Sequence, residues 1–203
     1  FLKKQERSTG ISESEIIKIA IKTLGLDELA PFNPEERIIE YMLDADANKP
    51  LVNMSLTDFA DETASESPAP GGGSISAYAG AMGISLGTMV ANLSAHKRGW
   101  DDRWEEFSAW AEKGMEYQRI LLDLVDEDTN AFNKIMDAFR LPKDTEAAKT
   151  IRQEAIQAAT KYAILTPFKV METAYNSMEV MKAMADFGNP NSVTDAGVGA
   201  LCA

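Results

Sequence analysis

Two aspartates, Asp128 and Asp195, are the side chains in this sequence best placed to transfer a proton. Asp128 lies four residues from both Leu124 and Phe132, which puts it at the edge of an apolar helical stripe rather than on a wet face. Partial shielding from water would suit its carboxylate to general acid–base chemistry, although a neighbouring cation or a helix end could satisfy it instead. Asp195 follows a turn and begins a helix of small residues, where the helix dipole favours a carboxylate with or without a catalytic role.

A glycine run in the segment SPAPGGGS, residues 67–74, joins a stiff, proline-containing loop to a stretch without acidic or basic residues that reaches Ala95. We expect a helix to begin there, capped by Ser74 or Gly73. The unpaired N–H groups at such a helix start suit an anion or a carbonyl oxygen, but a closely packed turn without a ligand would use the same residues. The candidate ligand-binding residues of this loop are Gly71, Gly72, Gly73 and Ser74.

The far end of the same stretch carries a second group of polar candidates. Asn92 lies on a helix of small, apolar residues, so a buried side chain there needs either helix carbonyls or a ligand as partner. His96, Lys97 and Arg98 form the one basic cluster that could meet an anionic ligand. A solvated helix end whose cations complement the carbonyl pole is the alternative.

Composition excludes several classes of function. The 203 residues carry a formal net charge of -12, which argues against a general nucleic-acid surface. Residues 75–95 are long enough to span a membrane, but serine, threonine and asparagine interrupt them, and we expect a bundle core instead. A single cysteine and a single histidine leave no disulfide and no Cys/His metal cluster, so we predict no metal and a reducing, cytoplasmic location.

The elements that must position these residues are all helical, because no run of alternating β-type residues occurs. We expect helices at residues 12–24, 35–43, 55–64, about 74–95, 100–140 and 146–185, and a last helix from Ser192 or Thr194. Pro167 should kink the longest helix, and its methionines Met171, Met178, Met181 and Met184 should fill the core. Two helices of about 40 residues exceed what a lone bundle needs, so a second copy should bury their outer stripes. A polar stretch at residues 46–50 predicts a domain boundary.

Three ordered motifs carry a family resemblance. The segments SLTDFADETASESPAPGGGSISAYAGAMGISLGTMVANL, VDEDTNAFNKIMDAFRLP and GNPNSVTDAGVGAL resemble the cyclodeaminase domain of bifunctional formimidoyltransferase-cyclodeaminases, whose superfamily includes stand-alone methenyltetrahydrofolate cyclohydrolases. This resemblance covers residues 51–203. Residues 1–50, with RSTGISESE and LGLDELAPFNPEERIIEYML, resemble the tail and linker of the transferase half in the bacterial enzyme. On this basis we expect a chain truncated at its C-terminal side, with further helices beyond Ala203.

The resemblance implies an all-α, dimeric or higher-order assembly of long helices that acts as an ammonia-lyase in histidine degradation and one-carbon metabolism. Its reaction would close 5-formimidoyltetrahydrofolate to 5,10-methenyltetrahydrofolate with release of ammonia, without metal or permanent cofactor. Asp128 or Asp195 would then handle the protons, while the backbone of residues 71–74 and Asn92 would hold the pterin or the folate amide. The residues that would meet the glutamate carboxylates of a folate, polyglutamylated or not, are Lys97 and Arg98.

Two other functions remain open at this point. The chain could hydrolyse methenyltetrahydrofolate as a cyclohydrolase, since the two reactions share the ring-closed compound. It could also be an inactive fragment that only holds folate or drives oligomerisation. A membrane anchor is the weakest alternative, for the reasons given above.

Overall fold

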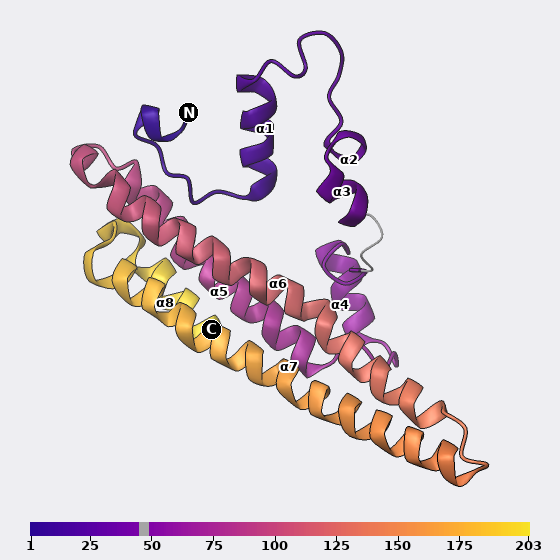
Figure 1. Ribbon diagram of the computed structural model, residues 1–203. Helices are drawn as coiled ribbons and strands as arrows, with labels where there is room; N and C mark the ends of the chain where they lie inside the picture. Colours follow the sequence, from indigo (N-terminus) through magenta and orange to yellow (C-terminus); the bar gives the residue numbers. More distant parts are fainter. Residues whose placement is uncertain (45–48) are drawn as a thin grey trace.

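The computed structural model describes residues 1–44 and 49–203, and every regular element within them is a helix (Figure 1). The all-α prediction is therefore confirmed. Three long helices lie side by side: α5 (Gly72–Ala95), α6 (Trp104–Arg140) and α7 (Glu146–Phe187). A short helix, α8 (Val193–Cys202), follows a 3₁₀ turn at Pro190–Ser192 and packs against α5 and α7.

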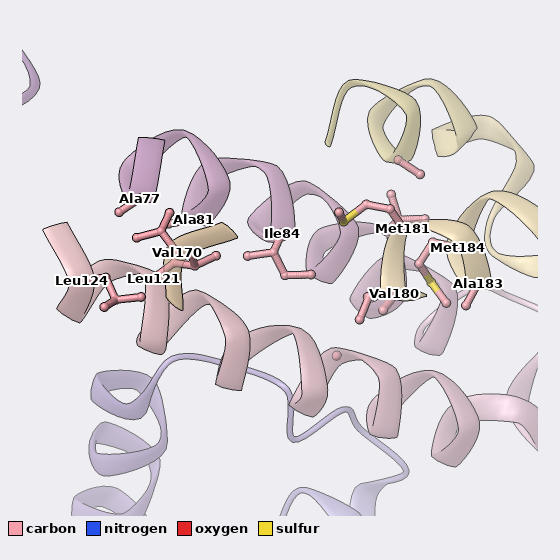
Figure 2. Packing of buried hydrophobic residues seen from close by; sticks show 14 of the residues in the cluster. Ala77, Ala81, Ile84, Leu121, Leu124, Val170, Val180, Met181, Ala183 and Met184 are labelled. Atoms are coloured by element: carbon pink, nitrogen blue, oxygen red, sulfur yellow. The ribbon is translucent and has the colours of Figure 1, made fainter. Parts of the chain in front are cut away.

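Helix α5 is the centre of the bundle because its small residues admit neighbours on several sides. It packs against α6, α7 and α8, and Ala77, Ala81 and Ile84 are almost completely inaccessible to solvent (Figure 2). A Cβ atom at Gly83 would lie 2.6 Å from the carbonyl oxygen of Gly199, so this crossing of α5 and α8 needs glycine. The helix begins at Gly72 with Gly71 as its N-cap, so the prediction of Ser74 or Gly73 as cap is wrong.

Helix α5 is the one described helix long and apolar enough to cross a membrane, with 56% of its apolar window buried in the protein. This burial is what the core helix of a bundle shows.

Helices α6 and α7 form a long antiparallel hairpin whose closed end extends beyond α5 (Figure 1). Helix α7 continues as one helix through Pro167. Met181 and Met184 are buried as predicted, whereas Met171 is 60% exposed and Met178 38% exposed. The hairpin also exposes Phe132, Met136, Phe139, Ile151, Ile164, Leu165 and Phe168.

The N-terminal residues form short helices away from the hairpin (Figure 1). Helix α1 (Glu13–Thr23) is capped by Ser12, whose Oγ accepts from the Glu15 N–H at 3.3 Å. The predicted helix at 35–43 is wrong as a single element: α2 (Pro34–Arg37) and α3 (Ile39–Asp44) are separated at the β-branched Ile38, whose backbone is extended.

The helix predicted at 55–64 is α4 (Leu56–Ala64), and Ser55 is its N-cap. The boundary predicted at 46–50 falls largely on residues 45–48, which lie outside the described residues.

Candidate functional site

The first turn of α5 is joined to α6 through Asp128. The Ser74 N–H donates to Oδ2 of this carboxylate at 3.2 Å, and the fully buried Ser74 hydroxyl donates to the carbonyl oxygen of Val125 at 2.8 Å. Asp128 is partly buried. One of its oxygens is thus satisfied by a helix end, which is one of the two alternatives expected from the sequence.

A cleft of about 450 Å³ opens beside this turn, between the start of α5, the middle of α7 and the end of α8. Its lining residues are Gly72, Gly73, Ser76, Ala79, Pro167, Val170, Met171, Ala174, Cys202 and Ala203. The first intrahelical bond of α5 is from Ile75 N–H to Gly71 carbonyl oxygen, and within the described residues no acceptor takes the N–H of Gly72 or Gly73. The cleft therefore combines backbone donors on one wall with apolar side chains on the other, which suits a flat ring bearing carbonyl or ring-nitrogen acceptors.

Asn92 lies at the opposite end of α5, 18 residues and roughly 27 Å from Ser74 at 1.5 Å per residue. Its Nδ2 donates to the carbonyl oxygen of Gly10 at 2.7 Å. Its Oδ1 is buried, and no donor reaches it from the part of the chain that the structure describes. The structure thus gives Asn92 a partner 82 residues away in the sequence and separates it from the glycine turn.

Residues 8–10, here called the N-terminal strap, cover this end of the bundle. The Ser8 N–H donates to His96 Nε2 at 3.2 Å, and the Thr9 N–H donates to Ser108 Oγ at 2.9 Å. A Cβ atom at Gly10 would lie 2.2 Å from Cβ of Ala111, so the strap lies directly on the backbone of α6.

Partial burial lowers the pKa of His96, and the nearby Arg7 lowers it further. Nε2 of the imidazole therefore stays unprotonated, as it must be to accept the hydrogen bond from the Ser8 N–H.

The predicted cations also lie at this second end. Lys97 Nζ is 3.9 Å from the centroid of the Trp100 ring, an arrangement typical of a cation–π contact. Arg98 is exposed. Neither side chain is brought to the cleft beside Gly72 and Gly73.

Asp195 occupies the first turn of α8 and is partly buried. The C-terminal end of α8 lines the cleft, and Asp195 is seven residues before Cys202, roughly 10 Å along the helix. The structure therefore brings Asp128 together with Gly73 and Ser74. It places Asp195 at the end of α8 that lies away from the cleft.

Sequence reasoning missed Asp126, whose side chain is the buried acidic group of α6. Its carboxylate accepts from the N–H groups of Leu51 at 2.8 Å and of Val52 at 3.2 Å, which fastens the segment before α4 to the bundle. The available signal was its position four residues after Leu122 on the apolar stripe. Within the described residues no group of three or more acidic, cysteine or histidine side chains could hold a metal ion.

Comparison with known families gives two matches in different parts of the chain. The family model described as formiminotransferase-cyclodeaminase matches residues 55–203, and the model of the formiminotransferase domain matches residues 1–44. The two matches leave residues 45–54 between them.

Individual relatives divide into long and short proteins. The formimidoyltransferase-cyclodeaminase of Mus musculus is 33% identical over 197 residues, which are 97% of this chain and 36% of the mouse protein. That of Gallus gallus is 35% identical over 98% of this chain and 37% of its own length, so the chain spans about a third of these relatives. A methenyltetrahydrofolate cyclohydrolase of Methylorubrum extorquens is 34% identical over 151 residues, covering 74% of this chain and 73% of that protein.

A solved structure shares the fold. The crystal structure of formiminotetrahydrofolate cyclodeaminase from Thermotoga maritima is 32% identical and superposes with a TM-score of 0.63, covering 74% of this chain and 71% of that one.

Proposed function

The chain belongs to the formiminotransferase-cyclodeaminase family, and we propose that residues 51–203 form a cyclodeaminase domain that closes 5-formimidoyltetrahydrofolate to 5,10-methenyltetrahydrofolate and releases ammonia. Residues 1–50 are then the tail and linker of the transferase half. The observation that carries this proposal is the Asp128 carboxylate, which accepts from the first turn of α5, beside a cleft where no described acceptor takes the N–H of Gly72 or Gly73.

The reaction needs one proton to move between two nitrogens. N10 of the folate attacks the amidinium carbon held on N5, so a C–N10 bond forms and a tetrahedral aminal results. N10 then loses its proton, the exocyclic nitrogen gains one, and the C–N bond to that nitrogen breaks to release ammonia. A single carboxylate such as Asp128 serves both transfers, because it accepts the N10 proton and returns it to the leaving amine.

The cleft suits the pterin ring of such a substrate. The N–H groups of Gly72 and Gly73 provide donors for the ring carbonyl or a ring nitrogen, and the α7 wall provides an apolar surface for its face. Asp128 binds the same turn through the Ser74 N–H, although its side chain is not part of the cleft wall.

The glutamate carboxylates of the substrate need cations, and in one chain Lys97 and Arg98 lie at the far end of α5. We propose that a homodimer, formed through the exposed apolar residues of the α6–α7 hairpin, brings these cations of one copy toward the cleft of the other. Asp195 is a candidate for the same shared site.

The decisive measurement is methenyl absorbance and ammonia release after mixing this chain with 5-formimidoyltetrahydrofolate. Equal amounts of both products, formed faster than in buffer and slowed by Asp128→Asn, would support the cyclodeaminase. Turnover that Asp128→Asn leaves unchanged would remove this carboxylate from the mechanism. Substrate binding without turnover would favour a folate-holding module.

Cyclohydrolase activity is the second candidate, because the chain covers 73% of a stand-alone methenyltetrahydrofolate cyclohydrolase. In that reaction water attacks the same methenyl carbon. Loss of methenyl absorbance when the chain is given 5,10-methenyltetrahydrofolate, above the rate in buffer and without ammonia release, would favour this activity.

A further inference from the structure

The three consecutive glycines before Ser74 differ in what surrounds them. A Cβ atom at Gly71 or at Gly72 would meet nothing within 4 Å. At Gly73 it would lie 2.1 Å from Oδ1, 2.4 Å from Cγ and 2.5 Å from Oδ2 of Asp128. The missing side chain of Gly73 is therefore the space that the Asp128 carboxylate occupies.

The Asp128 carboxylate and the first turn of α5 are held together on α6 by hydrogen bonds. Asp128 projects from the interior of α6, a helix of 37 residues, and Ser74 binds α6 through Val125 at the same place. Any side chain at residue 73 must push the carboxylate away from the Ser74 N–H or lift the first turn of α5 from α6.

We propose that Gly73 is a positioning residue for proton transfer: by lacking a Cβ atom it lets the Asp128 carboxylate rest on the Ser74 N–H, in the orientation that the reaction uses. This inference rests on the proposed cyclodeaminase function. It gives one of the three glycines a role through Asp128, separate from contact with substrate.

The test is a cycle of four forms of the whole chain: wild type, Gly73→Ala, Asp128→Ala and the double variant. Gly73→Ala should lower kcat about 10- to 100-fold with little change in KM, because it displaces the proton acceptor. In the Asp128→Ala background the same glycine change should lower kcat no further. Gly197→Ala, an identical change at an α8 position with nothing within 4 Å, is the control for the substitution itself.

Thermal unfolding of the same four proteins gives a readout that needs no activity. Gly73→Ala should lower the Tm in the wild-type background and not in the Asp128→Ala background, where the colliding carboxylate is gone. If Gly73→Ala alone does not fold, recovery of the fold in the double variant would also show that the methyl group collides with the Asp128 carboxylate.

Three results would count against the inference. An equal loss of kcat from Gly73→Ala in both backgrounds would show that the glycine acts on the cleft and not through Asp128. An equal fall in Tm in both backgrounds would show that the carboxylate is not what the methyl group meets. A wild-type chain without turnover would overturn the proposed function, and the unfolding cycle would still decide whether Gly73 accommodates Asp128.

Discussion

In the sequence, both ends of α5 carry polar residues that could bind a ligand. In the structure, these residues have different partners. At the N-terminal end, Gly72 and Gly73 line an open cleft and Asp128 of α6 reaches only one amide. At the C-terminal end, the N-terminal strap binds Asn92 and His96 by one hydrogen bond each, beside a second cleft of about 460 Å³ that both side chains line. Among the described residues, the N-terminal end keeps backbone donors without an acceptor, whereas the C-terminal end binds residues 8–10 of the chain.

The two ends of α5 also differ in which part of the chain they contact. The strap belongs to the segment that matches the formiminotransferase domain, whereas its partners belong to the segment that matches the cyclodeaminase half. The second end of α5 is therefore a place where the two matched segments contact each other.

The largest expected effect is at the open end. Asp128→Asn keeps the shape of the side chain but removes the proton acceptor, so kcat should fall by about 100-fold or more. Steady-state formation of the methenyl product measures it. Ser108→Ala, which removes a strap contact at the covered end, should leave kcat within about twofold on the same reasoning. Equal losses of kcat in the two variants would show that the two ends of α5 do not differ in their effect on turnover.

A substitution in the strap should lower the stability of the chain more than its activity. Gly10→Ala places a methyl group against the backbone of α6, and overpacking of this kind costs about 1–3 kcal/mol. The strap should detach, and trypsin should cleave after Arg7 faster than in wild type. The Gly197→Ala variant is the matched control. Unchanged cleavage after Arg7 would mean that the strap does not depend on this contact.

Asn92→Ala distinguishes a strap contact from a folate contact. It removes one donor to Gly10 but also the buried, unpartnered Oδ1, so the free energy of unfolding should fall by only about 0.5–1 kcal/mol. Urea unfolding measures that change. The KM for 5-formimidoyltetrahydrofolate should stay unchanged if Asn92 serves the strap. A clear rise in KM would place Asn92 in the folate site.

The smallest effect is a pH dependence of the strap. The pKa of His96 in the folded chain lies below its usual value of 6.5, so its contribution is present above pH 6.5 and is lost as pH falls through the folded pKa. Hydrogen exchange at the Ser8 amide should therefore become less protected in acid, after correction for the intrinsic rate. His96→Gln, which keeps an acceptor that does not titrate, should abolish that dependence.

Local signals in the sequence were enough for most helices. The helices predicted at 12–24 and 55–64 form and are capped by Ser12 and Ser55, and the helix predicted at 100–140 runs unbroken from Trp104 to Arg140. The break at Ile38 was missed because the 35–43 segment is amphipathic throughout and too short for propensity to decide its continuity. Among the four methionines of α7, periodicity could not tell Met181, which faces α5, from Met171, which lines the open cleft.

The sequence by itself determined the helical class, the family, and the identity of Asp128, Gly73 and Asn92 as residues that need a partner. These properties follow from local composition, periodicity and ordered motifs. Only the tertiary structure decided the partners, because Asp128 meets Ser74 across 54 residues and Asn92 meets Gly10 across 82. Those distances in the chain are closed by helix packing, and no local pattern encodes which end of α5 receives the N-terminal strap.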